Sequence, residues 1–400
     1  MPTRFCKKGD LLSWRDFGDR PGHVDSNRRH SFTLPRADNM IAAQLNASPA
    51  ALCARRPVRL ARSPKTTSPV RSARARRCKA DASASDGSSV DSKKQVVAIT
   101  GATGFVGKAL VASLLEDGHE VRILTRNAIS SRVAMPQAFL AGAKFYAWDT
   151  KSGAIEWYDA VKGCTGVVNL AGASISNPWN EQYKKTLVKS RLQTTKRIVD
   201  AINKLPIDQR PTLVSGSAVG FYGISKKKEF DESSKGGNDF LANLCKQWEA
   251  AANKCDTTVT TLRTGVVLEK GGGAMGKILP VFQLYGGGPL GSGKQWVSWI
   301  HRDDLINLIK AALADPKKYE GVINGTAPEP ATMNELCAAT ATATNRPNWL
   351  PVPGFALKLL LGEGATVVLD GQYVKPTKAK KLGFEFAYET VAEALDAIVN

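Results

Sequence analysis

Three glycines in the first apolar stretch of the presumptive core have the spacing of a dinucleotide-binding turn. Gly101, Gly104 and Gly107 lie in VVAITGATGFVGKALVASLL, between a predicted strand and a predicted helix. Gly101 permits a tight turn, Gly104 lets the backbone approach a pyrophosphate, and Gly107 permits close packing of helix on strand. The amide groups that begin the helix then face the phosphates. This context predicts a dinucleotide site, and the alternative is an ordinary Gly-rich turn.

The end of the second predicted strand indicates which nicotinamide cofactor such a site takes. An acidic residue there would bind the ribose 2′-hydroxyl of NAD, whereas an arginine accommodates the 2′-phosphate of NADP. Thr125 and Arg126 occupy this position in ILTRN. A guanidinium pairs with phosphate through two parallel hydrogen bonds, so Arg126 favours NADP(H) as the cofactor. The alternative is that Arg126 is a solvated surface residue. Asp149, after the third predicted strand, is either an adenine contact or a helix cap.

Strands alternating with helices must position these residues. The strand candidates are QVVAIT, HEVRILT, AKFYAW, GVVNLAG, PTLVSGSA and TVTTLRTGVVL. Segments between them, such as KRIVDAINK, place apolar residues at helical spacing. We therefore expect an α/β fold that begins at about Gln95: a doubly wound parallel Rossmann sheet with a small substrate lobe after the sixth strand.

The amino-terminal segment differs in composition from the remainder. Residues 1–80 contain 18 Lys or Arg and 5 Asp, and thus carry +13 of the net charge of +19. A basic, Ser-rich leader indicates an organelle transit peptide, and Met40 makes residues 1–39 a candidate upstream extension. The acidic, Ser-rich residues 81–94 have the composition of a disordered linker. The leader points to a chloroplast, with a mitochondrion as the alternative. A nucleic-acid-binding arm is disfavoured because aromatic residues for stacking are absent.

Cysteine and histidine content argues against two kinds of site. The 7 Cys include no CxxC pair and the 4 His are dispersed, so we expect neither a disulfide framework nor a metal site. A reducing compartment such as a stroma, a matrix or a cytosol fits this content. No uninterrupted run of 18 apolar residues occurs, and no transmembrane segment is expected.

Motifs along residues 95–400 occur in the order found in a known superfamily. GxxGxxG, NLAG after the fourth strand and SAVGFYG after the fifth resemble extended short-chain dehydrogenases/reductases. NLAGASI, SRLQTT, DFLANLCKQWEAAA, SWIHRDDL and GQYVKPTKAKKLGFEF narrow the resemblance to the atypical epimerase family branch, whose plant members are called Giant Chloroplast or SulA-like proteins. This resemblance implies an NADP-binding Rossmann domain with its substrate lobe over residues 95–348. It also implies a family-specific C-terminal accessory domain over residues 349–400.

The resemblance further implies which residues hold the cofactor. They belong to the glycine turn, the end of the second strand and the turn after the fourth strand: Gly101, Thr103, Gly104, Phe105, Val106, Gly107, Thr125, Arg126, Leu170, Ala171, Gly172 and Ala173. Some relatives carry Glu at the position of Ala173, so one ribose contact is expected to differ.

The catalytic group of the superfamily is missing at its usual positions. Active members use a Tyr as acid or base, a Lys four residues later that lowers the Tyr pKa, and a Ser that orients the substrate carbonyl. By motif alignment, this chain has Leu241, Cys245 and Ala218 at those places. Tyr222 is an alternative acid, with Ser217 as the orienting hydroxyl. Cys245, on the apolar face of a helix, is expected to be buried and inert.

Other motifs have simpler interpretations. GGGAMGK and GPLGSGK fit GxxxxGK, but Ile278 and Gln295 follow where a P-loop needs Ser or Thr for Mg²⁺. Arg263 and the loop lysines could bind an acidic substrate group, or they are solvated charges. His301 is expected to have a structural role, for example as a helix cap. The last helix, YETVAEALDAIVN, is expected to pack on the core.

Two function classes follow from these patterns. The first is a plastid NADP(H)-dependent oxidoreductase or epimerase-like enzyme with a rearranged acid/base group and a small polar substrate. The second is a non-catalytic NADP(H)-binding regulatory or scaffold protein with plastid-division or envelope-associated partners, as the resemblance implies. The missing catalytic group favours the second class, and the intact glycine turn favours a retained ligand in both. We expect no nucleic-acid partner.

Overall fold

The computed structural model describes residues 94–147 and 155–400, all of which belong to one compact unit. Three features expected from the sequence lie outside these residues: the leader 1–80, residues 81–93 of the linker, and Asp149. The first described strand begins at Val96, next to the expected start of the fold at Gln95.

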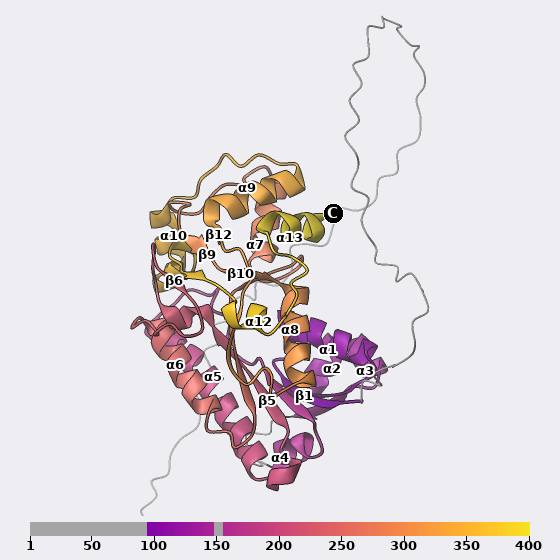
Figure 1. The fold of residues 1–400 in the computed structure, drawn as a ribbon. Coiled ribbons are helices and arrows are strands. Elements are labelled where there is room, and N and C mark those ends of the chain that lie inside the picture. Colours follow the sequence, from indigo (N-terminus) through magenta and orange to yellow (C-terminus); the bar gives the residue numbers. More distant parts are fainter. Residues whose placement is uncertain (1–93, 148–154) are drawn as a thin grey trace, which may run out of the picture. The chain divides into compact units, whose positions relative to one another are not determined.

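Parallel strands form the central sheet of the described region, in the order β11-β7-β5-β4-β1-β2-β3 (Figure 1). Their bounds are β1 Val96–Thr100, β2 Glu120–Thr125, β3 Lys144–Ala147, β4 Gly166–Asn169, β5 Thr212–Ala218, β7 Val259–Thr264 and β11 Gly321–Gly325. The order reverses at β1, which lies between β2 and β4. This is the doubly wound Rossmann arrangement, so the fold expected from the sequence is confirmed.

Helices cover both faces of the sheet because alternate strand residues point to opposite sides. Val97 and Ile99 of β1 pack in one cluster with α1 and α8, whereas Ala98 packs in another with α4, α5 and α6. Figure 1 shows these two helical layers on either side of the strands. The helix bounds are α1 Phe105–Glu116, α2 Ala128–Ala134, α3 Pro136–Leu140, α4 Ile155–Val161, α5 Glu181–Asn203, α6 Phe240–Ala252 and α8 Arg302–Ala314.

The sixth predicted strand is split in the structure, which corrects the sequence-based assignment. TVTTLRTGVVL forms β7 in the central sheet and then β8 (Val266–Leu268), which pairs with β10 (Trp299–His301). The two parts separate at Gly265, where a Cβ would lie 2.4 Å from the Ser298 carbonyl oxygen. The chain can leave the sheet here because this position has no side chain. The strands predicted from the sequence do not include β11, the seventh strand of the central sheet.

Segments after β7 build a third apolar cluster, around Trp299 and Phe282. It joins α7 (Met275–Gln283), α9 (Met333–Thr344) and α13 (Val391–Val399). Leu395 and Ile398 of α13 are buried there, so the expected packing of the last helix is confirmed. Residues 349–400 therefore share their apolar contacts with earlier parts of the chain.

The remaining elements are short. They are β6 Glu229–Phe230, β9 Trp296–Val297, β12 Ala331–Thr332, β13 Tyr373–Val374, α10 Gly354–Leu361, α11 Thr366–Leu369, α12 Thr377–Lys381 and the 3-10 turns η1 Ile207–Gln209, η2 Val219–Tyr222 and η3 Glu363–Ala365. Of the helices in the described residues, none combines the length and apolarity needed to cross a membrane.

Candidate functional site

The glycine turn has the geometry that its spacing predicts. Gly101 has φ +71°, and a Cβ there would lie 2.7 Å from the Leu170 carbonyl carbon. A Cβ on Gly107 would lie 2.2 Å from the Gly101 oxygen, so the helix approaches the turn more closely than a side chain allows. Gly104 begins α1 without a side-chain cap. The amide groups at this helix end are thus left to bind an anion.

An open cavity of about 530 Å³ lies at this end of α1. Its lining residues come from the turn, the first helix and two later segments: Thr103, Gly104, Phe105, Lys108, Ala109, Lys270, Gly271, Gly272 and Arg302. Three of them are cationic and none is acidic. Positive charge beside uncapped helix amides suits phosphate groups. The glycine motif predicts Thr103, Gly104 and Phe105 at this site, whereas no sequence pattern indicates the three cations.

Lys270 and Arg302 reach this cavity from far along the chain. The glycine loop after Lys270 lies on the Phe105 ring, since a Cβ on Gly272 would come within 2.2 Å of it. Arg302 lies 5.9 Å from the centre of the same ring and pairs with Glu269 at 3.0 Å. No local sequence signal connects these segments with the glycine turn.

The end of β2 leaves one arginine free. The Thr125 hydroxyl is 2.6 Å from that of Ser131, and Asn127 caps α2 by accepting from the Ser130 amide at 3.0 Å. Arg126 is exposed and has no hydrogen bond or ion pair with any described residue. Arg132, by contrast, lies over the Phe139 ring at 5.4 Å. Arg126 is therefore available to a ligand at this strand end.

A buried polar network fixes the turn after β4. The Thr100 hydroxyl donates to Asn169 Oδ1 at 2.8 Å, and Asn169 Nδ2 donates to the Thr195 hydroxyl at 2.8 Å. The Leu170 amide donates to the Thr100 oxygen at 3.2 Å. These bonds hold the ends of β1 and β4 beside each other, which places residues 170–173 next to the glycine turn.

Ser217 and Tyr222 are brought together indirectly, through an ion pair. The Ser217 hydroxyl donates to Glu249 Oε1 at 2.7 Å. Arg263 binds both Glu249 oxygens at 2.8 Å and donates from Nη1 to the Tyr222 hydroxyl at 3.0 Å. Tyr222 in turn donates to Asn324 Oδ1 at 2.7 Å. The pairing of Glu249 with Arg263 has no signal in the sequence, because the two residues lie on different elements, α6 and β7.

Burial determines the protonation state of the Tyr222 hydroxyl. Tyr222 is 3% exposed, and burial raises the pKa of its hydroxyl despite the nearby Arg263 charge. The phenol is therefore protonated at neutral pH, with both its donor and an acceptor site engaged by protein groups. Arg263 is also committed to Glu249, which argues against the substrate-binding role considered for it. These contacts favour a structural role for Tyr222 over the catalytic role considered from the sequence.

Cys245 lies on the buried face of α6, as expected. Burial and, to a smaller extent, the neighbouring Glu249 carboxylate raise the pKa of its thiol to about 11. A thiol in this state stays protonated at neutral pH and is a poor nucleophile.

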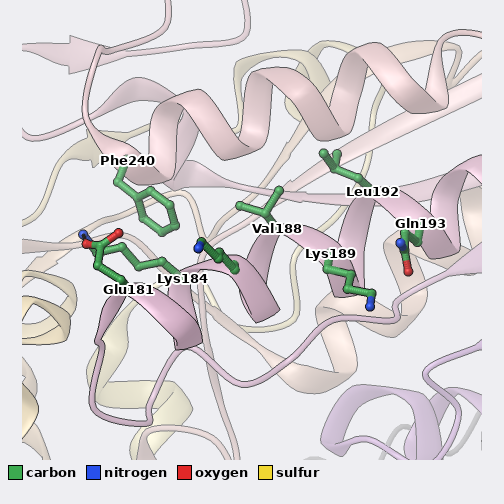
Figure 2. Close-up of a pocket in the computed structure, with 8 residues that line it drawn as sticks. Glu181, Lys184, Val188, Lys189, Leu192, Gln193 and Phe240 are labelled. Atoms are coloured by element: carbon green, nitrogen blue, oxygen red, sulfur yellow. Dashed lines mark hydrogen bonds and ion pairs between the residues drawn. The ribbon is translucent and has the colours of Figure 1, made fainter. Parts of the chain in front are cut away.

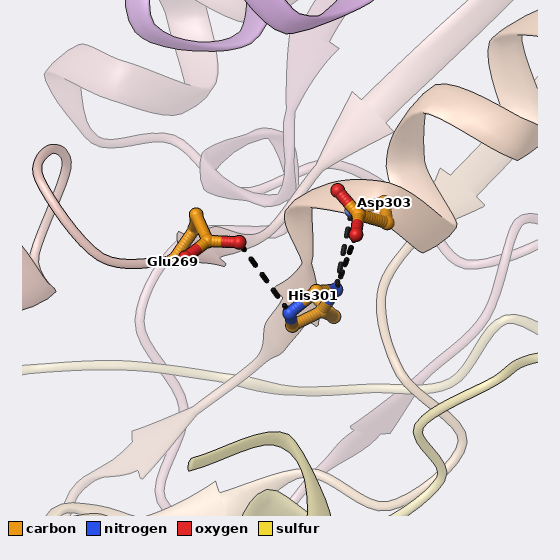
Figure 3. A group of neighbouring side chains, drawn as sticks. All are labelled: Glu269, His301 and Asp303. Atoms are coloured by element: carbon orange, nitrogen blue, oxygen red, sulfur yellow. Dashed lines mark hydrogen bonds and ion pairs between the residues drawn. The ribbon is translucent and has the colours of Figure 1, made fainter. Parts of the chain in front are cut away.

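The structure also gathers Glu269, His301 and Asp303, a set with metal-ligand chemistry (Figure 3). Figure 3 shows the two carboxylates on opposite sides of the imidazole ring. His301 Nδ1 already accepts the Asp303 amide at 3.2 Å and so caps α8, which confirms the capping role considered from the sequence. Both carboxylates pair with Arg302. The group is thus satisfied as a helix cap with ion pairs.

A second cavity, of about 500 Å³, lies along α5 (Figure 2). Lys184 pairs there with Glu181 at 2.8 Å and Glu363 at 2.7 Å, and lies 5.6 Å from the centre of the Phe240 ring. None of the lining residues belongs to the glycine turn or to the ends of β1 and β4.

Fold and site together define a dinucleotide-binding Rossmann protein of the short-chain dehydrogenase/reductase type. The model of the NAD dependent epimerase/dehydratase family matches residues 97–324, and the chain belongs to this family. A domain of unknown function, DUF1731, matches residues 352–398. The epimerase family membership expected from the motifs is therefore confirmed.

Individual relatives are similar over the same region. The epimerase family protein SDR39U1 homolog, chloroplastic, of Arabidopsis thaliana is 50% identical over 316 residues, which cover 78% of this chain and 89% of the relative. The human epimerase family protein SDR39U1 is 37% identical over 76% of this chain and 99% of its own length. A crystal structure of human SDR39U1 (isoform 2) with NADPH superposes with a TM-score of 0.67 and 34% identity, over 76% of this chain and 99% of that one.

Proposed function

We propose that this protein binds NADP(H) at the ends of β1, β2 and β4. The observation that carries the proposal is the uncapped start of α1, where the close backbone approaches at Gly101 and Gly107 exclude side chains. In this assignment the turn Gly101–Gly107, including Thr103, Phe105 and Val106, holds the pyrophosphate. The cations of the adjoining cavity add positive charge. The human relative crystallised with NADPH supports the same cofactor.

The two halves of the cofactor would contact the ends of different strands. Thr125 and the unpaired Arg126 would receive the 2′-phosphate at the end of β2. Residues 170–173, Leu170 to Ala173, would line the other half. Bound NADP(H) supplies a hydride donor or acceptor, and the chain's own residues hold and orient it.

Calorimetric titration of the full chain with NADPH and NADH tests this proposal. We expect tighter binding of NADPH, and Arg126→Ala should weaken it by about tenfold or more, the size of a lost charge-assisted hydrogen bond. NADH binding should not change. Arg132→Ala is the control, because this nearby arginine is engaged on aromatic rings. Failure of both nucleotides to bind would overturn the proposal.

We further propose that the protein acts in the chloroplast. The basic leader over residues 1–80 and the chloroplastic Arabidopsis relative support this location. A fluorescent reporter fused to residues 1–94 should enter chloroplasts, and the mature protein should begin between about Ala80 and Lys93. A reporter in mitochondria would contradict the location.

Turnover by an oxidoreductase or epimerase-like reaction is the second candidate. The observation in its favour is the Arg263 guanidinium, 3.0 Å from the Tyr222 hydroxyl, with Ser217 on the same network. A small polar substrate would have to reach this buried phenol. The regulatory alternative, with plastid-division or envelope-associated partners, rests on motif resemblance alone, and the relatives' names make no reference to plastid division.

A further inference from the structure

Arg191 lies on α5 at the carboxyl edge of the sheet. It is one turn from Leu187 and one from Thr195, both of which are fully buried, so it shares their face of the helix. Its Nη2 donates to the Ala173 oxygen at 3.1 Å and its Nη1 to the Leu187 oxygen at 3.2 Å. The guanidinium carbon lies 5.3 Å from the centre of the Trp248 ring. These contacts hold the guanidinium against the turn after β4.

This guanidinium has no counter-ion. Two other partly or fully buried arginines pair with carboxylates, Arg263 with Glu249 and Arg302 with Glu269. Arg191 forms no ion pair with any residue of the described region, and the titratable groups that act on its charge are a thiol and a phenol. Burial lowers the Arg191 pKa, yet an arginine keeps its proton in proteins. A positive charge out of full contact with water is costly unless an anion joins it.

The Arg191 guanidinium also has unused N–H donors, and its hydrogen bonds to the backbone hold it in one orientation. It carries five N–H groups, and the bonds to Ala173 and Leu187 use two of its nitrogens. Gly172 lies close beside it, since a Cβ there would be 3.0 Å from the guanidinium carbon. The absence of a side chain at Gly172 thus lets the arginine approach the turn backbone.

The sheet order indicates which part of a dinucleotide would meet Arg191. A dinucleotide lies across the crevice where the strand order reverses, with one mononucleotide half on each side. Here the β2 side carries Arg126, the candidate 2′-phosphate contact, so the adenosine half belongs there. The β4 side, where Arg191 contacts Ala173, is left for the nicotinamide half.

We propose that Arg191 binds the nicotinamide half of the dinucleotide, donating hydrogen bonds to oxygens of its phosphate and ribose. This inference rests on the proposed NADP(H) function and assigns a specific residue to it. The ligand supplies the negative charge that no protein group provides at this position.

Titration with two ligands distinguishes a contact between Arg191 and the nicotinamide half from general damage to the cofactor site. NADPH contains both halves, whereas adenosine 2′,5′-bisphosphate contains the adenosine half with its 2′-phosphate and lacks the nicotinamide half. The full chain is titrated with each by calorimetry, as wild type, Arg191→Met and Arg191→Lys. Arg197→Met is the matched control, because Arg197 lies on the same helix and is exposed.

We expect Arg191→Met to weaken NADPH binding by about tenfold or more and to leave adenosine 2′,5′-bisphosphate within about twofold. Arg191→Lys should be intermediate, because it retains the charge without the planar fork. Arg197→Met should change neither affinity.

Unchanged NADPH affinity in Arg191→Met would overturn the inference, and so would an equal loss for both ligands, which indicates damage to the whole site. If wild type fails to bind NADPH, the proposed function itself is wrong. If wild type binds and Arg191→Met binds equally well, only the role of Arg191 is wrong.

Discussion

Arg263 holds the Glu249 carboxylate through two hydrogen bonds of 2.8 Å, one from Nε and one from Nη2. Both side chains are buried, Glu249 on α6 and Arg263 on β7. This pair links the Ser217 hydroxyl to the Tyr222 hydroxyl, the two groups that the sequence offered as a replacement acid/base set. The two hydroxyls that suggest chemistry are therefore both hydrogen-bonded to buried protein groups that link β5, α6 and β7.

Glu249→Gln should destabilise the fold strongly. It leaves the Arg263 charge buried without a counter-ion, and breaking such a pair costs about 3–5 kcal/mol. The free energy of unfolding in urea measures the loss. Asp200→Asn is the control, since its pair with Lys196 is exposed and should contribute no more than about 0.5 kcal/mol. Equal effects of the two variants would contradict the structural role of the buried pair.

Tyr222→Phe should lower stability and leave cofactor binding unchanged. It removes a hydroxyl that donates to Asn324 and accepts from Arg263, and unsatisfied buried partners cost about 1–3 kcal/mol. Urea unfolding gives the stability and titration with NADPH gives the affinity. If a substrate is found, loss of turnover with unchanged stability would instead assign Tyr222 as the acid.

Gly101→Ala should damage the turn and the cofactor site together. A Cβ at this position meets the Leu170 carbonyl carbon at 2.7 Å, so the backbone must move. Gly163→Ala is a close control, because Gly163 has φ +73° against +71° but nothing within 4 Å of its added Cβ. The free energy of unfolding of the control should fall only by the cost of a left-handed backbone for alanine, about 1–2 kcal/mol. Gly101→Ala should lose more stability than the control and should also weaken NADPH binding. If the two variants lost the same stability and the same NADPH affinity, this prediction would be refuted.

His301 should make the fold less stable in mild acid. Burial lowers its pKa in the fold, against the opposing charges of Asp303 and Glu269. The unfolded chain therefore binds a proton below the ordinary histidine value of about 6.5, where the folded chain resists it. The stabilisation is complete above that pH and is lost progressively as the pH falls from it through the lower pKa of the folded state.

His301→Asn should remove this dependence while keeping a helix cap. Urea unfolding at pH 7.5 and pH 5.5 should show a larger loss for wild type than for the variant. Asp304 and Arg302 also act on the imidazole, so the comparison is made between the two proteins at each pH. An identical pH dependence would show that His301 does not titrate on unfolding.

Local features of the sequence predicted the strands and the cofactor turn. The glycine turn depends on a positive φ and on backbone approaches within a few residues, and both follow from residue type and spacing. The first five strands are short apolar runs separated by helical segments, so their periodicity sufficed. β11 was missed because GVING has glycine at both ends and a polar Asn324 in a strand of five residues.

Contacts between distant segments could not be predicted in this way. Tyr222 and Asn324 are 102 residues apart in the chain, and the cavity at α1 combines Lys108 with Lys270 and Arg302. Arg191 is a comparable case: in the sequence it is one basic residue in SRLQTT, with no sign that it lacks a counter-ion.

The sequence by itself determined the Rossmann class, the glycine turn and the arginine at the end of β2, because each is encoded within one strand-turn-helix unit. Tertiary structure alone decided that Tyr222 and Ser217 are bound into the Glu249–Arg263 pair and that Arg191 faces the turn after β4 uncompensated. The physical reason is that burial and charge pairing are properties of the neighbours a side chain meets in space. Those neighbours come from elements that only the folded sheet and its helices bring together.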